Sequence, residues 1–197
     1  MKSRNQKHIF LSLALIALLS VCVLIFASCG KEPTETVTVR YENTDGGIVI
    51  TGYDGYLSDT TDFRIPESIE GKDVVAIADG AFAGREDLKK ITLPATVKNI
   101  GKDAFKNCKN LEYVNIPEGV SEIKDATFAG CTSLKEVNLP DSITAVADSA
   151  YSKCNSIDHL SAPAFALERF DLTPLKTLNI RGDMAVSEGM LDRKSVV

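Results

Sequence analysis

The chain has 197 residues, 44% apolar and 25% charged, so it is long enough for one domain and apolar enough to bury a core. Its formal net charge of −5 argues against a nucleic-acid-binding body, which would need a basic face. It has no Trp and only two His residues, which leaves little acid–base or metal-binding chemistry.

Residues 1–28 have the pattern of an export signal. Three basic residues lie among the first eight, residues 9–27 are almost all apolar, and Ala27-Ser28 precedes Cys29. A basic start, an apolar run and small residues before a cleavage point are typical of such signals. The ending is similar to the lipobox of bacterial lipoproteins, although Phe26 stands where Leu is usual. That resemblance implies that Cys29 receives a lipid and becomes the new N-terminus.

An uncleaved transmembrane anchor is the alternative, because about 18 apolar residues can span a bilayer. Either reading attaches the body to a membrane outside the cytoplasm, and we expect the cell surface. Loss of the three basic residues of the signal would shift the formal charge from −5 to −8. Residues 29–36 are polar with one proline and predict a short lipidated tether.

Residues 37–66 form the predicted entry segment of the body. Val37, Val39 and Tyr41 alternate with polar residues, Ile48 and Ile50 do the same, and Asp45-Gly46 between them is a hairpin signal. We therefore expect a β-hairpin that caps the open end of whatever follows.

The central part of the chain repeats every 23 residues. Six columns of residues keep this spacing. One is of proline (Pro94, Pro117, Pro140, Pro163) and one is aromatic (Phe82, Phe105, Phe128, Tyr151). Two are aliphatic columns of the strand (Leu88, Leu111, Leu134, Ile157; and Ile91, Val114, Val137, Leu160), one is the return-side column (Ile77, Ile100, Ile123, Val146), and the last is Arg85 followed by Cys108, Cys131 and Cys154. So many columns in one register indicate a solenoid, whose coils bury their apolar positions only by stacking.

Each repeat carries a strand pattern of the L-x-x-L-x-L type. Leu111, Val114 and Ile116 are expected to point inward, and Pro117 ends the strand because it has no N–H to donate. Val120 and Ile123 supply the return side, and Thr127-Phe128 opens a short helical turn. The predicted fold is a β-dominated leucine-rich-repeat solenoid with short helical turns.

The repeat unit resembles the BspA-type leucine-rich repeat of bacterial surface proteins. It reads A-F-x-x-C-x-x-L-x-x-V-x-I-P-x-x-V-x-x-I over residues 104–123, and the match is close over about residues 63–163. The stretch from Ile65 to Ile77 is similar to a first coil five residues longer than the others. We place the solenoid at residues 67–163. An adhesive role is what the resemblance implies.

Residues 164–197 are harder to interpret. The segment Leu175-Lys176-Thr177-Leu178-Asn179-Ile180 repeats the strand pattern, but Leu175 follows Ile157 too closely to keep the period of the repeat. The segment is either a degenerate repeat with an irregular cap or the end of a truncated, longer array.

The chemical candidates are few. Three cysteines in line could suggest a disulfide or a metal site, but they cannot all pair and no His stands at zinc spacing, so small buried side chains are the simpler interpretation. His159 is the only His of the exported body. We expect no catalytic residues, no metal and no cofactor, and therefore no enzyme. Arg181-Gly182-Asp183 spells an integrin-binding tripeptide, or is a simple turn.

The predicted strand face is the candidate ligand-binding surface, unless it is an ordinary solvated face. Its outward positions include Lys89, Thr92, Asp158 and Ser161, and the expected ligand-binding residues are Lys90, Glu112, Tyr113, Asn115, Lys135, Glu136, Asn138 and His159. Mixed charges with a single aromatic suit a protein or glycan of a host or neighbouring cell better than a small molecule. The alternatives are a structural spacer of a longer array and an accessory envelope lipoprotein. The sequence does not specify an oligomeric state.

The first prediction concerns anchoring. Replacement Cys29→Ala removes the thiol that would carry the lipid, so we expect no incorporation of labelled fatty acid and accumulation of the uncleaved precursor. Metabolic labelling and gel mobility measure both. Normal labelling of the variant would rule out lipidation at Cys29.

Overall fold

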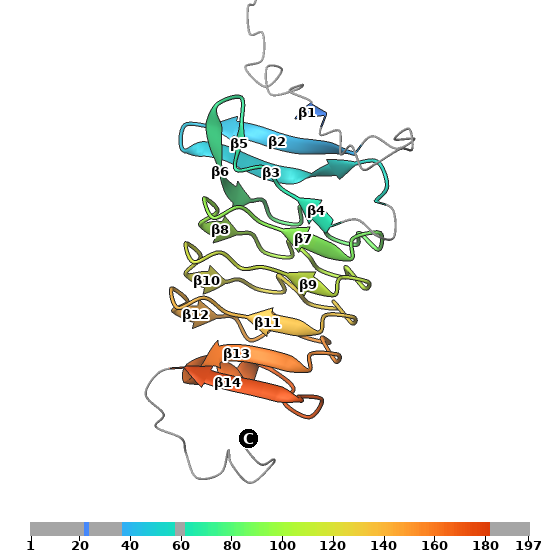
Figure 1. The fold of residues 1–197 in the computed structure, drawn as a ribbon, viewed down its shortest axis with the longest axis vertical. Helices are drawn as coiled ribbons and strands as arrows, with labels where there is room; N and C mark the ends of the chain where they lie inside the picture. Colours follow the sequence, from blue (N-terminus) through green and yellow to red (C-terminus); the bar gives the residue numbers. More distant parts are fainter. Residues whose placement is uncertain (1–21, 24–36, 58–61, 182–197) are drawn as a thin grey trace, which may run out of the picture.

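The computed structural model describes residues 22–23, 37–57 and 62–181. They form a stack of coils around one continuous apolar core, with a hairpin at the N-terminal end (Figure 1). Nearly all regular structure is strand, and the only helix in these ranges is the 3₁₀ helix η1 (Ala164–Arg169). The predicted β-dominated repeat solenoid is confirmed.

The strands are short and follow one another in a fixed order along the stack. They are β1 (Cys22–Val23), β2 (Thr38–Thr44), β3 (Gly47–Asp54), β4 (Asp62–Arg64), β5 (Ser68–Ile69), β6 (Lys72–Ile77), β7 (Lys90–Thr92), β8 (Asn99–Ile100), β9 (Tyr113–Val114), β10 (Glu122–Ile123), β11 (Glu136–Asn138), β12 (Ala145–Val146), β13 (His159–Pro163) and β14 (Thr177–Arg181). Strand β1 lies within the predicted export signal and pairs antiparallel with β2.

The N-terminal cap is the antiparallel hairpin β2–β3. The predicted hairpin is confirmed, and because Thr44 pairs with Gly47 its loop consists of the two residues Asp45 and Gly46. Ile48, Ile50 and Tyr53 of β3 are buried. Strand β6 pairs in parallel with β3 and then with β8, so the cap joins the return side of the solenoid without a break.

The strand face consists of β4, β7, β9, β11, β13 and β14, which are parallel where they pair. Its register gives the length of each coil. The first step, from Asp62 to Lys90, is the longest, because the hairpin β5–β6 is inserted into the first coil. The steps from Lys90 to Tyr113 and from Glu136 to His159 keep the period of the repeat. The last step, from His159 to Thr177, is the shortest.

Between the two rows of strands, the chain runs through tight turns where the sequence predicts a short helical turn. In these turns, hydrogen bonds to the next coil alternate with hydrogen bonds within the coil. The N–H groups of Phe128 and Gly130 donate to carbonyls of the next coil at 2.9 and 2.8 Å. Those of Ala129 and Cys131 donate three residues back along the chain, both at 3.1 Å, as in a 3₁₀ turn. Alternate residues thus tie neighbouring coils together.

A column of aromatic rings runs through the core. Phe82, Phe105, Phe128 and Tyr151 stack with centroids 5.1–5.3 Å apart and ring planes within 16° of parallel. Tyr53 of the cap contacts one end of this column, and Phe170 the other. Strands in a sheet lie about 4.7–4.9 Å apart, so one ring for each coil fits the stack with almost no gap.

The residue before each member of the Arg85/cysteine column has left-handed backbone. Gly84, Asn107, Gly130 and Lys153 have φ between 58° and 78°. Gly and Asn are the residue types that adopt this conformation most readily. Gly130 also lies against its neighbour in the stack, since a Cβ there would come within 2.3 Å of the Asn107 amide oxygen.

The last described coil is shorter but continues the stack. Helix η1 buries Ala166 and Leu167, and Phe170 then reaches the aromatic column. Strand β14 pairs with β13 along its whole length, from Thr177 to Arg181. Residues 182–197, which complete the predicted terminal segment, lie outside the described residues.

The second prediction tests the inward and outward positions. Leu134 is fully buried, so Leu134→Ala should lower the free energy of unfolding by about 2–5 kcal/mol through lost burial and a cavity. The adjacent Lys135 is exposed, and Lys135→Ala should lower it by less than about 1 kcal/mol. Urea denaturation of both variants gives the comparison, and equal losses would contradict the assignment.

Candidate functional site

The strand face presents polar columns because β4, β7, β9, β11 and β13 each bury a residue whose two neighbours along the chain point outward. Phe63, Ile91, Val114, Val137 and Leu160 occupy these buried positions and are 4% exposed or less. Side chains alternate along a strand, so the residues on either side point outward. The parallel pairing then places equivalent residues of successive coils side by side.

The column just before the strands alternates in charge. It contains Lys89, Glu112, Lys135, Asp158 and Lys176. The Lys135 ammonium lies 2.6 Å from Glu112, and the Lys176 ammonium lies 2.7 Å from Asp158. The hydrogen bonds from Lys176 and His159 hold the pKa of the Asp158 carboxyl below its ordinary value. These charges are therefore largely compensated within the stack.

The next column contains Lys90, Tyr113, Glu136 and His159. The Lys90 ammonium lies 5.3 Å from the centroid of the Tyr113 ring, close enough for a cation–π contact, and 3.7 Å from Asp62. Tyr113 is half-buried between its neighbours, whereas His159 is exposed. The aromatic residue predicted for this face is thus partly covered.

The column at the far end of the strands is uncharged over five successive coils. Its residues there are Thr92, Asn115, Asn138, Ser161 and Asn179. The Asn115 side chain accepts from the Leu93 N–H at 2.6 Å and donates to the Leu93 carbonyl at 2.8 Å. Asn115 thus links two coils, although the sequence placed it among the ligand-binding residues.

The exposed part of the face lies toward the C-terminal coils. A shallow, open depression of about 270 Å³ is lined by Glu136, Asn138, His159, Leu160, Ser161, Thr177 and Asn179. Asn138 donates to the Glu136 carboxylate at 2.5 Å, and Asn179 donates to the Ser161 hydroxyl at 3.3 Å. Three of the predicted residues meet here, and Thr177 and Asn179 were not predicted because they belong to the coil with the shifted register.

The eight predicted ligand-binding residues divide into two groups. Lys90, Lys135, Asn138 and His159 are exposed, whereas Glu112, Tyr113, Asn115 and Glu136 are half-buried. Ile116, predicted to point inward, packs against the core but is only partly buried. Cys29, the predicted lipidation residue, lies outside the described residues.

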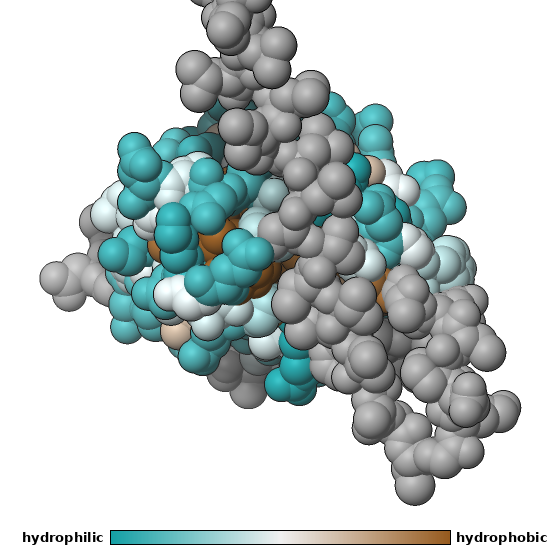
Figure 2. Space-filling model, turned by 90° about the horizontal axis from the view of Figure 1, so that it is seen from above, coloured by the Kyte–Doolittle hydropathy of each residue, from teal (hydrophilic) through white to brown (hydrophobic). Residues whose placement is uncertain are grey.

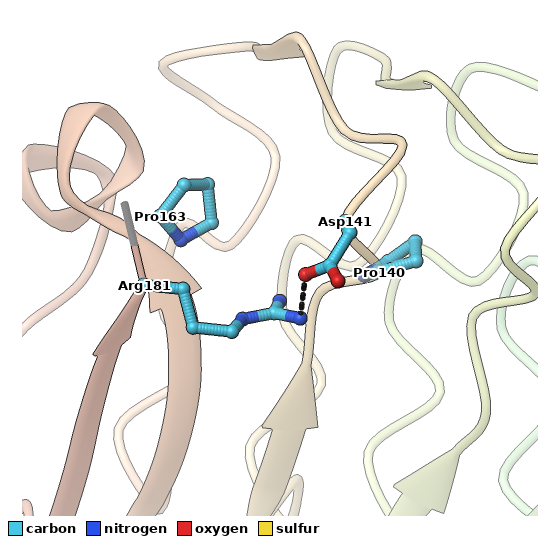
Figure 3. A pocket seen from close by; sticks show the side chains of 4 residues that line it. All are labelled: Pro140, Asp141, Pro163 and Arg181. Atoms are coloured by element: carbon cyan, nitrogen blue, oxygen red, sulfur yellow. Dashed lines mark hydrogen bonds and ion pairs between the residues drawn. The ribbon is translucent and has the colours of Figure 1, made fainter. Parts of the chain in front are cut away.

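The arginine of the Arg-Gly-Asp tripeptide is held by the fold. Arg181 extends past Pro163 and forms an ion pair with Asp141, two coils away, in a small pocket that also includes Pro140 (Figure 3). Its side chain is 30% exposed. Gly182 and Asp183 lie outside the described residues.

The cysteine column is structural. Cys108, Cys131 and Cys154 are free and buried, and each thiol donates to the carbonyl of the aromatic residue 26 positions earlier, at 3.0–3.1 Å. Burial raises the pKa of Cys108 and Cys154 to about 12 and raises that of Cys131 as well. Such thiols lack the thiolate character that nucleophiles and metal ligands need.

Arg85 takes the place of the first cysteine, and its role was not apparent from the sequence. Its guanidinium donates to the Gly55 carbonyl at 2.6 Å, pairs with Asp87 at 2.9 Å and lies 3.7 Å from the centroid of the Tyr53 ring. Asp87 in turn accepts from the Leu57 N–H at 2.9 Å. In later coils the cysteine thiol at this position donates to a carbonyl of the preceding coil. In the first coil the longer Arg85 side chain reaches carbonyls of the cap instead.

Two further observations concern the described residues. They contain no group of three or more His, Cys, Asp or Glu side chains that could hold a metal ion. They also contain no helix with the length and apolar character to cross a bilayer.

The stacked coils, the inward aliphatic columns and the parallel strand face define a leucine-rich-repeat solenoid. The family model described as "BspA type Leucine rich repeat region" matches residues 56–182 in six copies, and the chain belongs to this family. None of the curated proteins matches the sequence.

Solved structures share the fold. A leucine-rich cell surface protein from Faecalibacterium prausnitzii is 24% identical with a TM-score of 0.60, and the match covers 79% of this chain but 40% of that one. The leucine-rich-repeat protein of T. pallidum is 25% identical, with a TM-score of 0.54 over 72% of this chain and 78% of its own. One from Bacteroides capillosus is 26% identical, with a TM-score of 0.53 over 78% of this chain and 98% of its own.

The third prediction follows from the buried thiols. An unfolded chain releases thiol protons above about pH 8.5, whereas the native chain keeps them to a higher pH. The native state then binds more protons, so the free energy of unfolding should fall as the pH rises, by about 1.4 kcal/mol per pH unit for each thiol. Urea denaturation at about pH 9 and about pH 10 measures this slope.

The variant Cys131→Ala provides the control. It removes one of the three buried thiols, so its stability should depend on pH less steeply than that of the parent over the same range. Equal slopes for the two proteins would mean that the thiols do not titrate as their burial indicates.

Proposed function

We propose that this protein is a membrane-anchored binding module that recognises a macromolecule through its strand face. The observation that carries this proposal is the row of outward polar side chains on six strands, which ends in the exposed depression over β11, β13 and β14. Solenoids present such extended surfaces to their partners. The pattern of residues 1–29 supports attachment through a lipid on Cys29 at the cell surface.

The shape of the depression favours a large ligand. A pocket for a small molecule is concave and mostly apolar, so that it covers most of the ligand surface. Here the depression is open, so a small ligand in it would remain largely exposed to solvent. A macromolecule would gain affinity instead by contacting several coils at once.

A spacer is the second candidate. Compensation of charges between coils, as in the pairs Lys135–Glu112 and Lys176–Asp158, stabilises an array whether or not it binds anything. The chain also spans only 40% of the F. prausnitzii protein. If the chain is a spacer, substitutions on the strand face should leave adhesion unchanged.

The fourth prediction compares these candidates. In cells that display the full chain, Tyr113→Ala combined with Glu136→Ala removes the ring and the carboxylate in the middle of the face. Binding energy concentrates in a few central residues, so we expect adhesion to target cells or matrix protein to fall about tenfold or more. Neither residue is fully buried, and a melting curve close to that of the parent shows that the fold is retained.

Two comparisons complete the experiment. Asp183→Glu alters the Arg-Gly-Asp tripeptide and keeps its charge, and we expect adhesion to persist because Arg181 is held by Asp141. Adhesion lost in this variant alone would place binding at the tripeptide. Unchanged adhesion in all variants would favour the spacer.

A further inference from the structure

The depression over β11, β13 and β14 has the chemistry of a site for hydroxyl groups. Its polar lining side chains are Glu136, Asn138, His159, Ser161, Thr177 and Asn179. Together they offer amide donors and acceptors, hydroxyls that do both, an imidazole and one carboxylate. Such a mixture can form hydrogen bonds with a ligand whose polar groups each donate and accept, as sugar hydroxyls do.

The neighbouring charges do not favour an ionic ligand. Lys135 is neutralised by Glu112, and Asp158 lies between Lys176 at 2.7 Å and the His159 ring at 2.6 Å. A polyanion needs unpaired cations, and a polycation needs unpaired carboxylates. Glu136 is the one acid of the lining, and it already accepts from Asn138.

A protein ligand fits this surface less well. Protein interfaces depend on aromatic or arginine anchors in desolvated pockets surrounded by a polar rim. Among the described residues of the depression, Leu160 is apolar but 2% exposed, and no aromatic side chain is present. A surface of amides and hydroxyls, interspersed with the aliphatic parts of these side chains and Leu160, supplies contacts of the kind that polyols make.

The repeat adds a geometric reason. Asn138, Ser161 and Asn179 occupy the same position on three adjacent strands, and so do Glu136, His159 and Thr177. Neighbouring strands lie about 4.7–4.9 Å apart, close to the length of one sugar ring. A chain of sugars laid across the strands therefore meets one pair of these residues at each ring.

We propose that the depression over β11, β13 and β14 binds an uncharged polysaccharide whose chain runs across the strands, along the solenoid axis. This inference deepens the proposed function and rests on it, because it names the class of ligand. Asn138 and Asn179 bind ring hydroxyls, and Glu136 accepts from them.

The test is retention of the full-length chain, solubilised in detergent, on immobilised polysaccharides. The neutral supports are cellulose, xylan, mannan and dextran, the charged support is alginate, and the protein supports are gelatin and albumin. We expect at least one neutral polysaccharide to retain the chain, and alginate not to. The double variant Asn138→Ala, Asn179→Ala should weaken retention about tenfold or more, since it removes two amides from the centre of the site.

A matched control is available on the return side of the solenoid. Asn99 in β8 is an exposed asparagine of a strand, as Asn138 is, but it lies in the other row of strands. Asn99→Ala should keep the full retention of the parent. Melting curves of the control and the double variant should coincide with that of the parent.

Two results would overturn the inference. The first is the absence of retention on every neutral support, and the second is equal retention of the double variant and the parent. Retention on gelatin that Tyr113→Ala with Glu136→Ala abolishes would leave the proposed function intact and assign a protein ligand. Adhesion of cells that no strand-face variant alters would instead refute the proposed function.

Discussion

The structure depends on the fact that no coil can bury its own side chains. Each coil contributes one ring, and Phe82, Phe105, Phe128 and Tyr151 stack at 5.1–5.3 Å from the cap to the last coil. This spacing is close to that of hydrogen-bonded strands. One shift from coil to coil therefore stacks the rings, forms the backbone hydrogen bonds and packs the aliphatic columns. The sequence must therefore repeat with a fixed length, because a side chain out of register would not lie in its column.

The same translation governs the surface. Residues one period apart become neighbours, much as residues four apart do on a helix. Like charges at one repeat position would repel along the whole stack, and the order Lys89, Glu112, Lys135, Asp158 and Lys176 avoids this. Charges on this face are thus largely paired with one another between coils, whereas the amide and hydroxyl positions are neutral.

The ends of the stack are where the repeat is altered. At the N-terminal end, Arg85 replaces the thiol and reaches the carbonyls of Tyr53 and Gly55, and the cap covers the first coil. Seen from above, the described surface in view is mainly hydrophilic, with smaller apolar patches between the hydrophilic side chains (Figure 2). At the other end, η1 shortens the coil and still delivers Phe170 to the column. Both changes extend the aromatic column beyond the regular repeats, to Tyr53 at one end and Phe170 at the other.

The period, most inward columns and the hairpin at Asp45-Gly46 could be predicted from the sequence, because they follow from local alternation and repetition, and the family resemblance added the longer first coil. Which outward residues are available became visible only in the folded stack. Asn115 and Asn138 share one repeat position, yet Asn115 is bound to the backbone of Leu93 and Asn138 lines the depression. Arg181 likewise finds Asp141, which lies far earlier in the chain. Periodicity fixes the direction of a side chain, but its partner depends on what the neighbouring coils place beside it.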